Sequence, residues 1–252
     1  MSLFRVCSSL LLLLPFIKSS AQDKDYCFKQ ADSVLMSENA ASILYKKLTA
    51  LKNLFIPSRS DIRCDLNRDV DFGYRHWRFN VTLNLNKCQI DLLLRNDTIY
   101  AKVIRYYLIP FSNNTSARFH DTAMVGAFDY LNLRNKFYHS NKSISDLLNE
   151  LSISKVYAHT CGIISSRTEE SLYVEDLAKN KDVQKLFTML QSICVETQAY
   201  GVSGFNMLKR QKVKIDAVTN QIVDHIIKRN SETITCSGCK SGLIEKIYSE
   251  RK

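Results

Sequence analysis

The sequence predicts an α+β protein in which an N-terminal helix packs on a three-stranded antiparallel meander, followed by a mostly helical C-terminal half. Apolar and polar residues alternate strictly over 77–86, which is typical of a half-buried strand, and apolar residues recur at helical spacing through much of the chain after 119. The low counts of Gly (7) and Pro (3) argue against an all-β protein with many tight turns.

The first 21 residues have the features of a cleavable signal peptide. Arg5 precedes the apolar run 10–17, which is too short to span a bilayer but fits the apolar core of an export signal. Ser19 and Ala21 hold the small-residue positions before a cleavage point, so we expect cleavage after Ala21; an uncleaved anchor is the alternative. The sequence therefore predicts a secreted or periplasmic protein with no membrane span in the mature chain.

The mature chain is basic. The formal charge of +10 falls to +8 when the signal leaves with Arg5 and Lys18 and no acid. This charge suits an anionic polymer or another protein as partner, and it is explained equally well by solubility. The most basic stretch, 208–214, carries four cations without interleaved aromatics, so we expect a solvated helix end there rather than a nucleic-acid site.

The first region, 22–111, is predicted to contain one helix and the meander. Residues 27–53 have the periodicity of a helix, with breaks at 32–33 or 37–39, and the polar run 58–71 predicts a loop. The strands are expected near 77–85, 90–94 and 98–108, with Asn96-Asp97 as a hairpin turn. We expect one face of this sheet to be buried under the helix and the other to be wet, with Ile99, Ala101 and Val103 on one face.

The second region, 119–252, is predicted to be mainly helical and could share one core with the first. The asparagine-rich loop 112–118 is the candidate boundary. The helices are expected at 122–138, 145–151, 169–178, 182–200 and 216–228. Ser143 or Ser145 is a candidate N-cap, and 156–161 is a candidate strand or extended segment.

Seven cysteines remain after cleavage, and an oxidising compartment makes disulfides the default. Because seven is odd, at least one thiol must be free, bound to a metal or paired with another chain. Spacing does not choose among the pairings; a Cys64–Cys88 bond is one hypothesis. The disulfide candidates are Cys27, Cys64, Cys88, Cys161, Cys194, Cys236 and Cys239.

Five Asn-X-Ser/Thr sequons occur, and in a eukaryotic host they would be glycosylation sites. They lie at Asn80, Asn96, Asn113, Asn114 and Asn141.

Two cysteine motifs could carry chemistry. The pair in Cys236-Ser-Gly-Cys239 could chelate zinc, form a redox-active disulfide or be structural. For a redox motif, we expect a strand ending near 234–235 and a helix over 241–248. His159 and Cys161 would complete a four-ligand zinc set, although Cys161 stands where a zinc deaminase has its catalytic Glu.

A thiol hydrolase is a further interpretation. Cys161 would be the nucleophile, and His120, His139 or His225 its base. Cys161 could equally be a half-cystine or a core residue. His120-Asp121 lies at a loop–helix junction, which suits a functional site, but Asp121 is explained as well by capping the helix from Thr122.

These observations favour an exported, non-catalytic binding or interaction protein of unknown ligand, and they imply no cofactor. The alternative is an extracytoplasmic hydrolase or metal-dependent enzyme built around His120, His139, His159 and Cys161. A disulfide at Cys161 together with scattered histidines would count against the enzyme, whereas a shared concave pocket would favour it.

Overall fold

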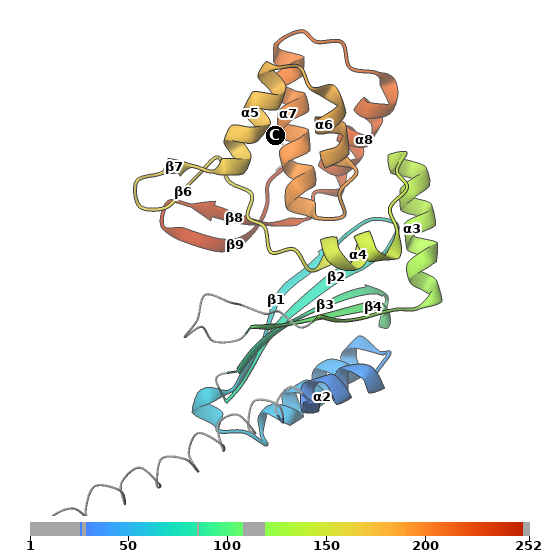
Figure 1. Ribbon diagram of the computed structural model, residues 1–252, viewed down its shortest axis with the longest axis vertical. Coiled ribbons are helices and arrows are strands. Elements are labelled where there is room, and N and C mark those ends of the chain that lie inside the picture. Colours follow the sequence, from blue (N-terminus) through green and yellow to red (C-terminus); the bar gives the residue numbers. More distant parts are fainter. Residues whose placement is uncertain (1–25, 27–28, 85, 108–118, 249–252) are drawn as a thin grey trace, which may run out of the picture.

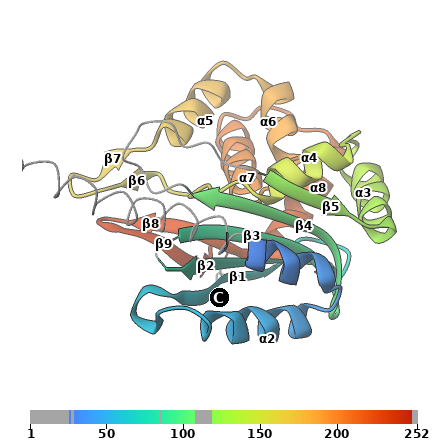
Figure 2. The ribbon, with the colours of Figure 1, turned by 60° about the horizontal axis from the view of Figure 1, so that its bottom comes forward.

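Figures 1 and 2 show the computed structural model, which describes Tyr26 and residues 29–84, 86–107 and 119–248. The predicted signal peptide, Cys27 and the predicted boundary loop 112–118 lie outside these residues. The expected mixture of helices with an antiparallel sheet is confirmed.

A five-stranded antiparallel sheet in the order β1-β2-β3-β4-β5 is the central layer of the described chain (Figure 1). Its strands are Asp61–Asp69 (β1), Arg75–Leu83 (β2), Asn86–Arg95 (β3), Thr98–Tyr107 (β4) and Phe119–Ala123 (β5). The three central strands match the predicted meander, but the prediction missed both edges. A loop was expected where β1 lies, because an edge strand can be polar along most of its length. A helix was expected to begin at Thr122, which lies in β5.

The N-terminal helical segment packs on one face of the sheet, as expected. Helical residues 29–37 are followed by a break at 38–40 and by α2, Ala41–Lys52, and the short helix η1, Pro57–Arg59, comes next. Leu44 and Leu48 of α2 are fully buried against the sheet residues Phe79, Ile90 and Leu92. The apolar face of the helix, whose residues recur about every 3.6 positions, thus packs on the apolar face of β2, whose residues alternate along the strand.

The other face of the sheet is covered as well, so the expectation of a wet face is wrong. The covering helices are α3, Val125–Tyr138, and α4, Ile144–Leu151 (Figure 1). Arg78 of β2 is only 3% exposed; its Nε lies 2.7 Å from the Asp91 carboxylate, and its Nη2 donates to the carbonyls of Leu151 and Ile153. Polar residues of the period-two pattern therefore form a buried ionic cluster instead of a solvated surface.

A β-bulge divides the apolar residues of β4 between the two faces. Leu93 pairs with Ala101 and Leu94 pairs with Ile99, which leaves Tyr100 as the extra residue. Ile99 therefore packs with the N-terminal helices, whereas Ala101 packs with α3 and α4. The expectation that Ile99, Ala101 and Val103 share a face is wrong, because the bulge shifts the pleat by one residue.

The C-terminal helices form a third cluster. They are α5 (Glu169–Lys179), α6 (Val183–Leu190), α7 (Val195–Arg210) and α8 (Ala217–Arg229). Ser143, one of the two predicted N-caps, caps α4 in a capping box, and Asp216, where the last helix was expected to begin, caps α8. The single helix expected over 182–200 is instead broken at 191–194, and α7 continues through Gly204.

Two hairpins complete the described chain. They consist of β6 (Thr160–Cys161) with β7 (Ser166–Arg167), and β8 (Glu232–Ser237) with β9 (Lys240–Lys246). The helix expected over 241–248 is wrong: most of that segment is a strand, paired with β8 through a Gly-containing turn. None of the helices in the described ranges is both long and apolar enough to cross a membrane.

Candidate functional site

The cysteines predicted to carry chemistry form a disulfide. Cys161 of β6 is bonded to Cys236 of β8, so in this state neither offers a thiolate to a substrate or a metal. Cys239, the other thiol of the Cys-x-x-Cys pair, is free and exposed between β8 and β9. Within the described ranges, no group of three His, Cys, Asp or Glu side chains could hold a metal ion.

The histidines proposed for an enzyme do not gather around Cys161. His139 is exposed and ends α3 in the left-handed conformation, with φ 51°. His159 is exposed, and its Nδ1 lies 3.3 Å from Oγ of Ser171. The backbone of His120 lies in β5, but its side chain is outside the described part. The neighbouring Asp121 is also in β5, so it does not cap α3, whose N-cap is Met124.

Among the other disulfide candidates in the described chain, Cys64, Cys88 and Cys194 are free. The hypothetical Cys64–Cys88 bond is absent, because β2 lies between the strands that carry these two residues. Cys64 is exposed, whereas Cys88 and Cys194 are buried.

The sequons differ in accessibility. Asn96, in the β3–β4 turn, and Asn141, before α4, are exposed. Asn80 is half-buried on β2, and its amide donates to Asp65. Asn113 and Asn114 lie outside the described residues.

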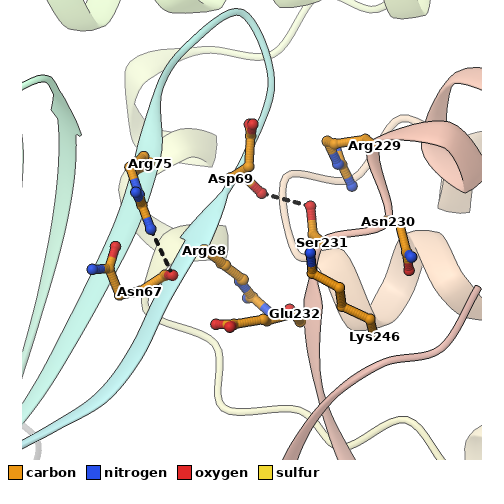
Figure 3. Close-up of a pocket in the computed structure, with 9 residues that line it drawn as sticks. All are labelled: Asn67, Arg68, Asp69, Arg75, Arg229, Asn230, Ser231, Glu232 and Lys246. Atoms are coloured by element: carbon orange, nitrogen blue, oxygen red, sulfur yellow. Dashed lines mark hydrogen bonds between the residues drawn. The ribbon is translucent and has the colours of Figure 1, made fainter. Parts of the chain in front are cut away.

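A pocket of about 270 Å³ lies where the β1–β2 hairpin meets the end of α8 and the open end of the β8–β9 hairpin (Figure 3). Three chain segments, 67–75, 229–232 and Lys246, come together there. We call it the basic pocket, and its lining residues are Asn67, Arg68, Asp69, Arg75, Arg229, Asn230, Ser231, Glu232 and Lys246.

Arg68 is the first of two buried cations of the basic pocket. Its guanidinium makes a bidentate pair with Glu196 of α7, at 2.5 and 3.2 Å, and both side chains are at most 2% exposed. Burial opposes ionisation of Glu196, but Arg68 and the backbone N–H of Ile234 hold the pKa of its carboxyl below the usual range. Arg68 is thereby fixed in place and tied to β8.

Arg229 is the second buried cation. Its Nη1 lies 2.6 Å from Oδ2 of Asp71, and its Nη2 donates to Gln198 Oε1 at 2.8 Å. Arg134 of α3 reaches the same Asp71 oxygen at 2.8 Å. Burial opposes ionisation of Asp71, but the charge of Arg229 and the hydrogen bond with His225 hold the pKa of this carboxyl far below its usual range.

The outer cations of the basic pocket are not paired in this way. Arg75 and Lys246 are exposed, and neither forms an ion pair with any residue in the described ranges. Nη2 of Arg75 donates to the carbonyl of Asn67 at 3.0 Å (Figure 3). These two side chains can therefore turn to an external anion without breaking an internal ion pair.

Two acids also line the basic pocket. Oδ1 of Asp69 accepts the backbone N–H of Asp71 at 2.8 Å, and in Figure 3 its carboxylate points toward the hairpin tip. Glu232 presents its backbone carbonyl to Arg68 at 3.3 Å. Neither acid forms an ion pair with a described residue, so the charges of both carboxylates oppose an anion in the basic pocket.

Unmatched hydrogen-bonding atoms lie in the walls of the same pocket. Within the described chain, Nε of Arg68, Nε of Arg229 and Oδ1 of Asn67 have no hydrogen-bond partner although they are buried. Most buried polar atoms in folded proteins are paired, so this concentration of unmatched atoms is unusual.

Sequence reasoning missed the basic pocket. Arg229 lies just beyond the helix predicted over 216–228, and 67–71 was expected to be part of a loop. No spacing pattern links 67–75 with 229–246, since tertiary packing alone brings them together. Comparison with protein-family models, curated proteins and solved structures finds no match to this chain.

Proposed function

We propose that this is an exported, non-catalytic binding protein for an anionic polymer, and that the basic pocket receives one anionic group of that polymer. The observation that carries the proposal is the pair Arg75 and Lys246, two exposed cations at one pocket, neither of which forms an ion pair with a residue in the described part of the chain. Behind them, Arg68 and Arg229 are held in place by buried carboxylates.

The pocket is too small to enclose a whole drug-sized ligand, so its size favours the binding of one chemical group of a larger ligand. Pockets that enclose a whole drug-sized molecule have volumes of roughly 300–1,000 Å³. At about 270 Å³ and open to solvent, the basic pocket suits a phosphate, sulfate or carboxylate with the part of the chain that carries it. The net charge of +8 expected for the mature protein would attract such a polymer over a longer range.

The buried ion pairs favour anion binding by making the wall of the basic pocket rigid. The positions of Arg68 and Arg229 are set by bonds to Glu196, Asp71 and Gln198. A pocket wall that is already ordered avoids an entropic cost on binding. The outer residues Arg75 and Lys246 then supply the bonds to the ligand.

The disulfide at Cys161 counts against the hydrolase alternative. Its intended nucleophile, Cys161, is bonded to Cys236, and the described histidines near that region are exposed and separate.

The proposal is tested by chromatography on an immobilised sulfated polysaccharide, with salt elution. The variant Arg75→Ala/Lys246→Ala removes both outer cations. The control Arg59→Ala/Lys209→Ala removes two exposed cations elsewhere, so the net charge is matched. We expect the first variant to elute at clearly lower salt than wild type and the control to elute close to wild type.

Two results would reject the proposal. Equal shifts for the two variants would show that binding follows net charge alone. An unchanged elution of Arg75→Ala/Lys246→Ala would show that the polymer binds elsewhere.

A further inference from the structure

The tips of the two C-terminal hairpins form a protrusion far from the basic pocket along β8–β9. The disulfide Cys161–Cys236 joins β6 to β8, and the backbone N–H of Gly162 donates to the carbonyl of Gly238 at 2.8 Å. Figure 1 shows the β6–β7 loop and the β8–β9 turn side by side at the edge of the molecule. We call residues 160–167 and 237–242 the double tip.

Two adjacent isoleucines form the apolar end of the double tip. Ile163 is 88% exposed and Ile164 is 86% exposed, the highest values for any large apolar side chain in the described chain. Both lie in a four-residue loop between β6 and β7 whose backbone is set by Gly162 at φ 93° and Ser165 at φ 49°. Packing within the protein gives no reason for two aliphatic side chains to occupy this position.

The charge of the double tip is of one sign. It contains Arg167 and Lys240 and no Asp or Glu. Arg167 pairs with Glu175 of α5, whereas Lys240 is exposed and forms no ion pair with a described residue. An exposed aliphatic pair beside an unpaired cation is complementary to the interface of an anionic lipid bilayer, where phosphates lie above acyl chains.

We propose that the double tip inserts Ile163 and Ile164 into the interface of an anionic lipid membrane, with Lys240 at the level of the lipid phosphates. The contact is peripheral and reversible. A protein partner is a weaker match, since a stable protein interface buries about 1,000 Å² or more and two side chains on a convex loop supply little of that. The disulfide and the Gly162–Gly238 bond keep the loop presented for insertion.

The test is flotation of the exported, purified protein with vesicles of phosphatidylcholine alone and of phosphatidylcholine with phosphatidylglycerol. We expect wild type to float with the anionic vesicles and much less with the neutral ones. Ile163→Ser/Ile164→Ser should lose about tenfold or more of the binding, and Lys240→Glu should weaken it on anionic vesicles. The matched control, Leu54→Ser/Val125→Ser, removes two other exposed aliphatic side chains, 72% and 79% exposed, and should bind as wild type does.

Three results would overturn the proposal. They are no flotation of the wild type, flotation of Ile163→Ser/Ile164→Ser equal to that of wild type, and loss of flotation in the control as well. Size-exclusion chromatography identifies the competing occupant: a wild-type dimer that the isoleucine variant abolishes would place a second copy of the chain on the double tip. Arg75→Ala/Lys246→Ala should retain vesicle binding, so this test is independent of the basic pocket.

Discussion

The carboxylate of Asp71 and the guanidinium of Arg229 lie 2.6 Å apart in the interior and join the β1–β2 turn to the end of α8. Asp71 is 2% exposed and has a positive φ of 93°, so the turn places its side chain inward at some conformational cost. Arg134 and His225 bind the same carboxylate. One acid thus organises the wall of the basic pocket.

Replacing Asp71 with Asn should strongly destabilise the protein. The variant keeps the shape of the side chain but leaves Arg134 and Arg229 buried without their counter-charge, which typically costs about 3–5 kcal/mol. Urea denaturation at neutral pH measures the loss. Asp61→Asn is the control, because Asp61 is 64% exposed and lies 3.5 Å from Lys52, and its loss should cost under about 1 kcal/mol. Equal effects of the two changes would refute the organising role of Asp71.

The free energy of unfolding should fall as the pH is lowered from about 6.5 to about 4, because the buried His76 resists protonation in the folded protein. Burial lowers the pKa of this histidine from 6.5 to about 4, although Asp91 lies 2.7 Å away and opposes the shift. We therefore take the contact as a hydrogen bond from a neutral ring at pH 7, not as an ion pair. Between these pH values the unfolded chain binds a proton that the folded chain does not, so the free energy of unfolding drops by about 3 kcal/mol.

The pH effect is measured by urea denaturation across this range for wild type and for His76→Gln. The variant should be less stable at pH 7 but should lose much less stability on acidification. Parallel curves for the two proteins would show that His76 is not the titrating group.

Gly204→Ala should destabilise the packing of α7 against α6. An added Cβ would lie 2.3 Å from Cδ2 of Leu186, which is fully buried, and 3.2 Å from Cγ1 of Val174. We expect a net loss of about 1–3 kcal/mol despite the better helix propensity of Ala. In a Leu186→Ala background the same change should cost less, because the truncation vacates the space, and an identical cost in both backgrounds would contradict the contact.

The free thiols should react in a fixed order. Cys239 is exposed. Cys64 is exposed as a residue, but its thiol is part-buried, and this desolvation raises its pKa. Cys88 is buried, and burial raises its pKa to about 12. Burial also raises the pKa of Cys194. Brief maleimide treatment followed by peptide mass spectrometry should label Cys239 first, then Cys64, with Cys88 and Cys194 protected until unfolding. Rapid labelling of Cys88 or Cys194 would contradict their burial.

Glu232→Gln should strengthen anion binding. Its carboxylate lines the basic pocket without an ion-pair partner among the described residues, and the change removes this repulsive charge while keeping the backbone contact to Arg68. Calorimetric titration with inorganic pyrophosphate at low ionic strength is the measurement, with a several-fold lower Kd as the expected result. Weaker binding by the variant would mean that Glu232 contacts the ligand favourably.

Local patterns predicted much of the secondary structure. The alternation in β2, the capping residue Ser143 and the start of α8 at Asp216 depend on residues close together in the chain, and each appears as expected. The polar edge strand β1 and the bulge at Tyr100 were missed, because pairing across the sheet determines both.

The pairing of the cysteines could not be predicted from spacing. Cys161 and Cys236 were both disulfide candidates, but their pairing depends on two hairpins meeting in space. His76, Arg78 and Asp91 were expected to face water or went unremarked, because a period-two pattern does not show whether a second layer covers the polar face. The basic pocket was missed because it joins three segments distant in sequence.

The most direct test of the account is the calorimetric affinity of inorganic pyrophosphate for wild type, for Arg75→Ala/Lys246→Ala and for Arg59→Ala/Lys209→Ala. Loss of two charge-assisted hydrogen bonds should weaken binding at least about tenfold in the first variant. The control should match wild type. Undetectable binding by wild type, or equal affinities for all three proteins, would contradict the assignment of the basic pocket as the anion site.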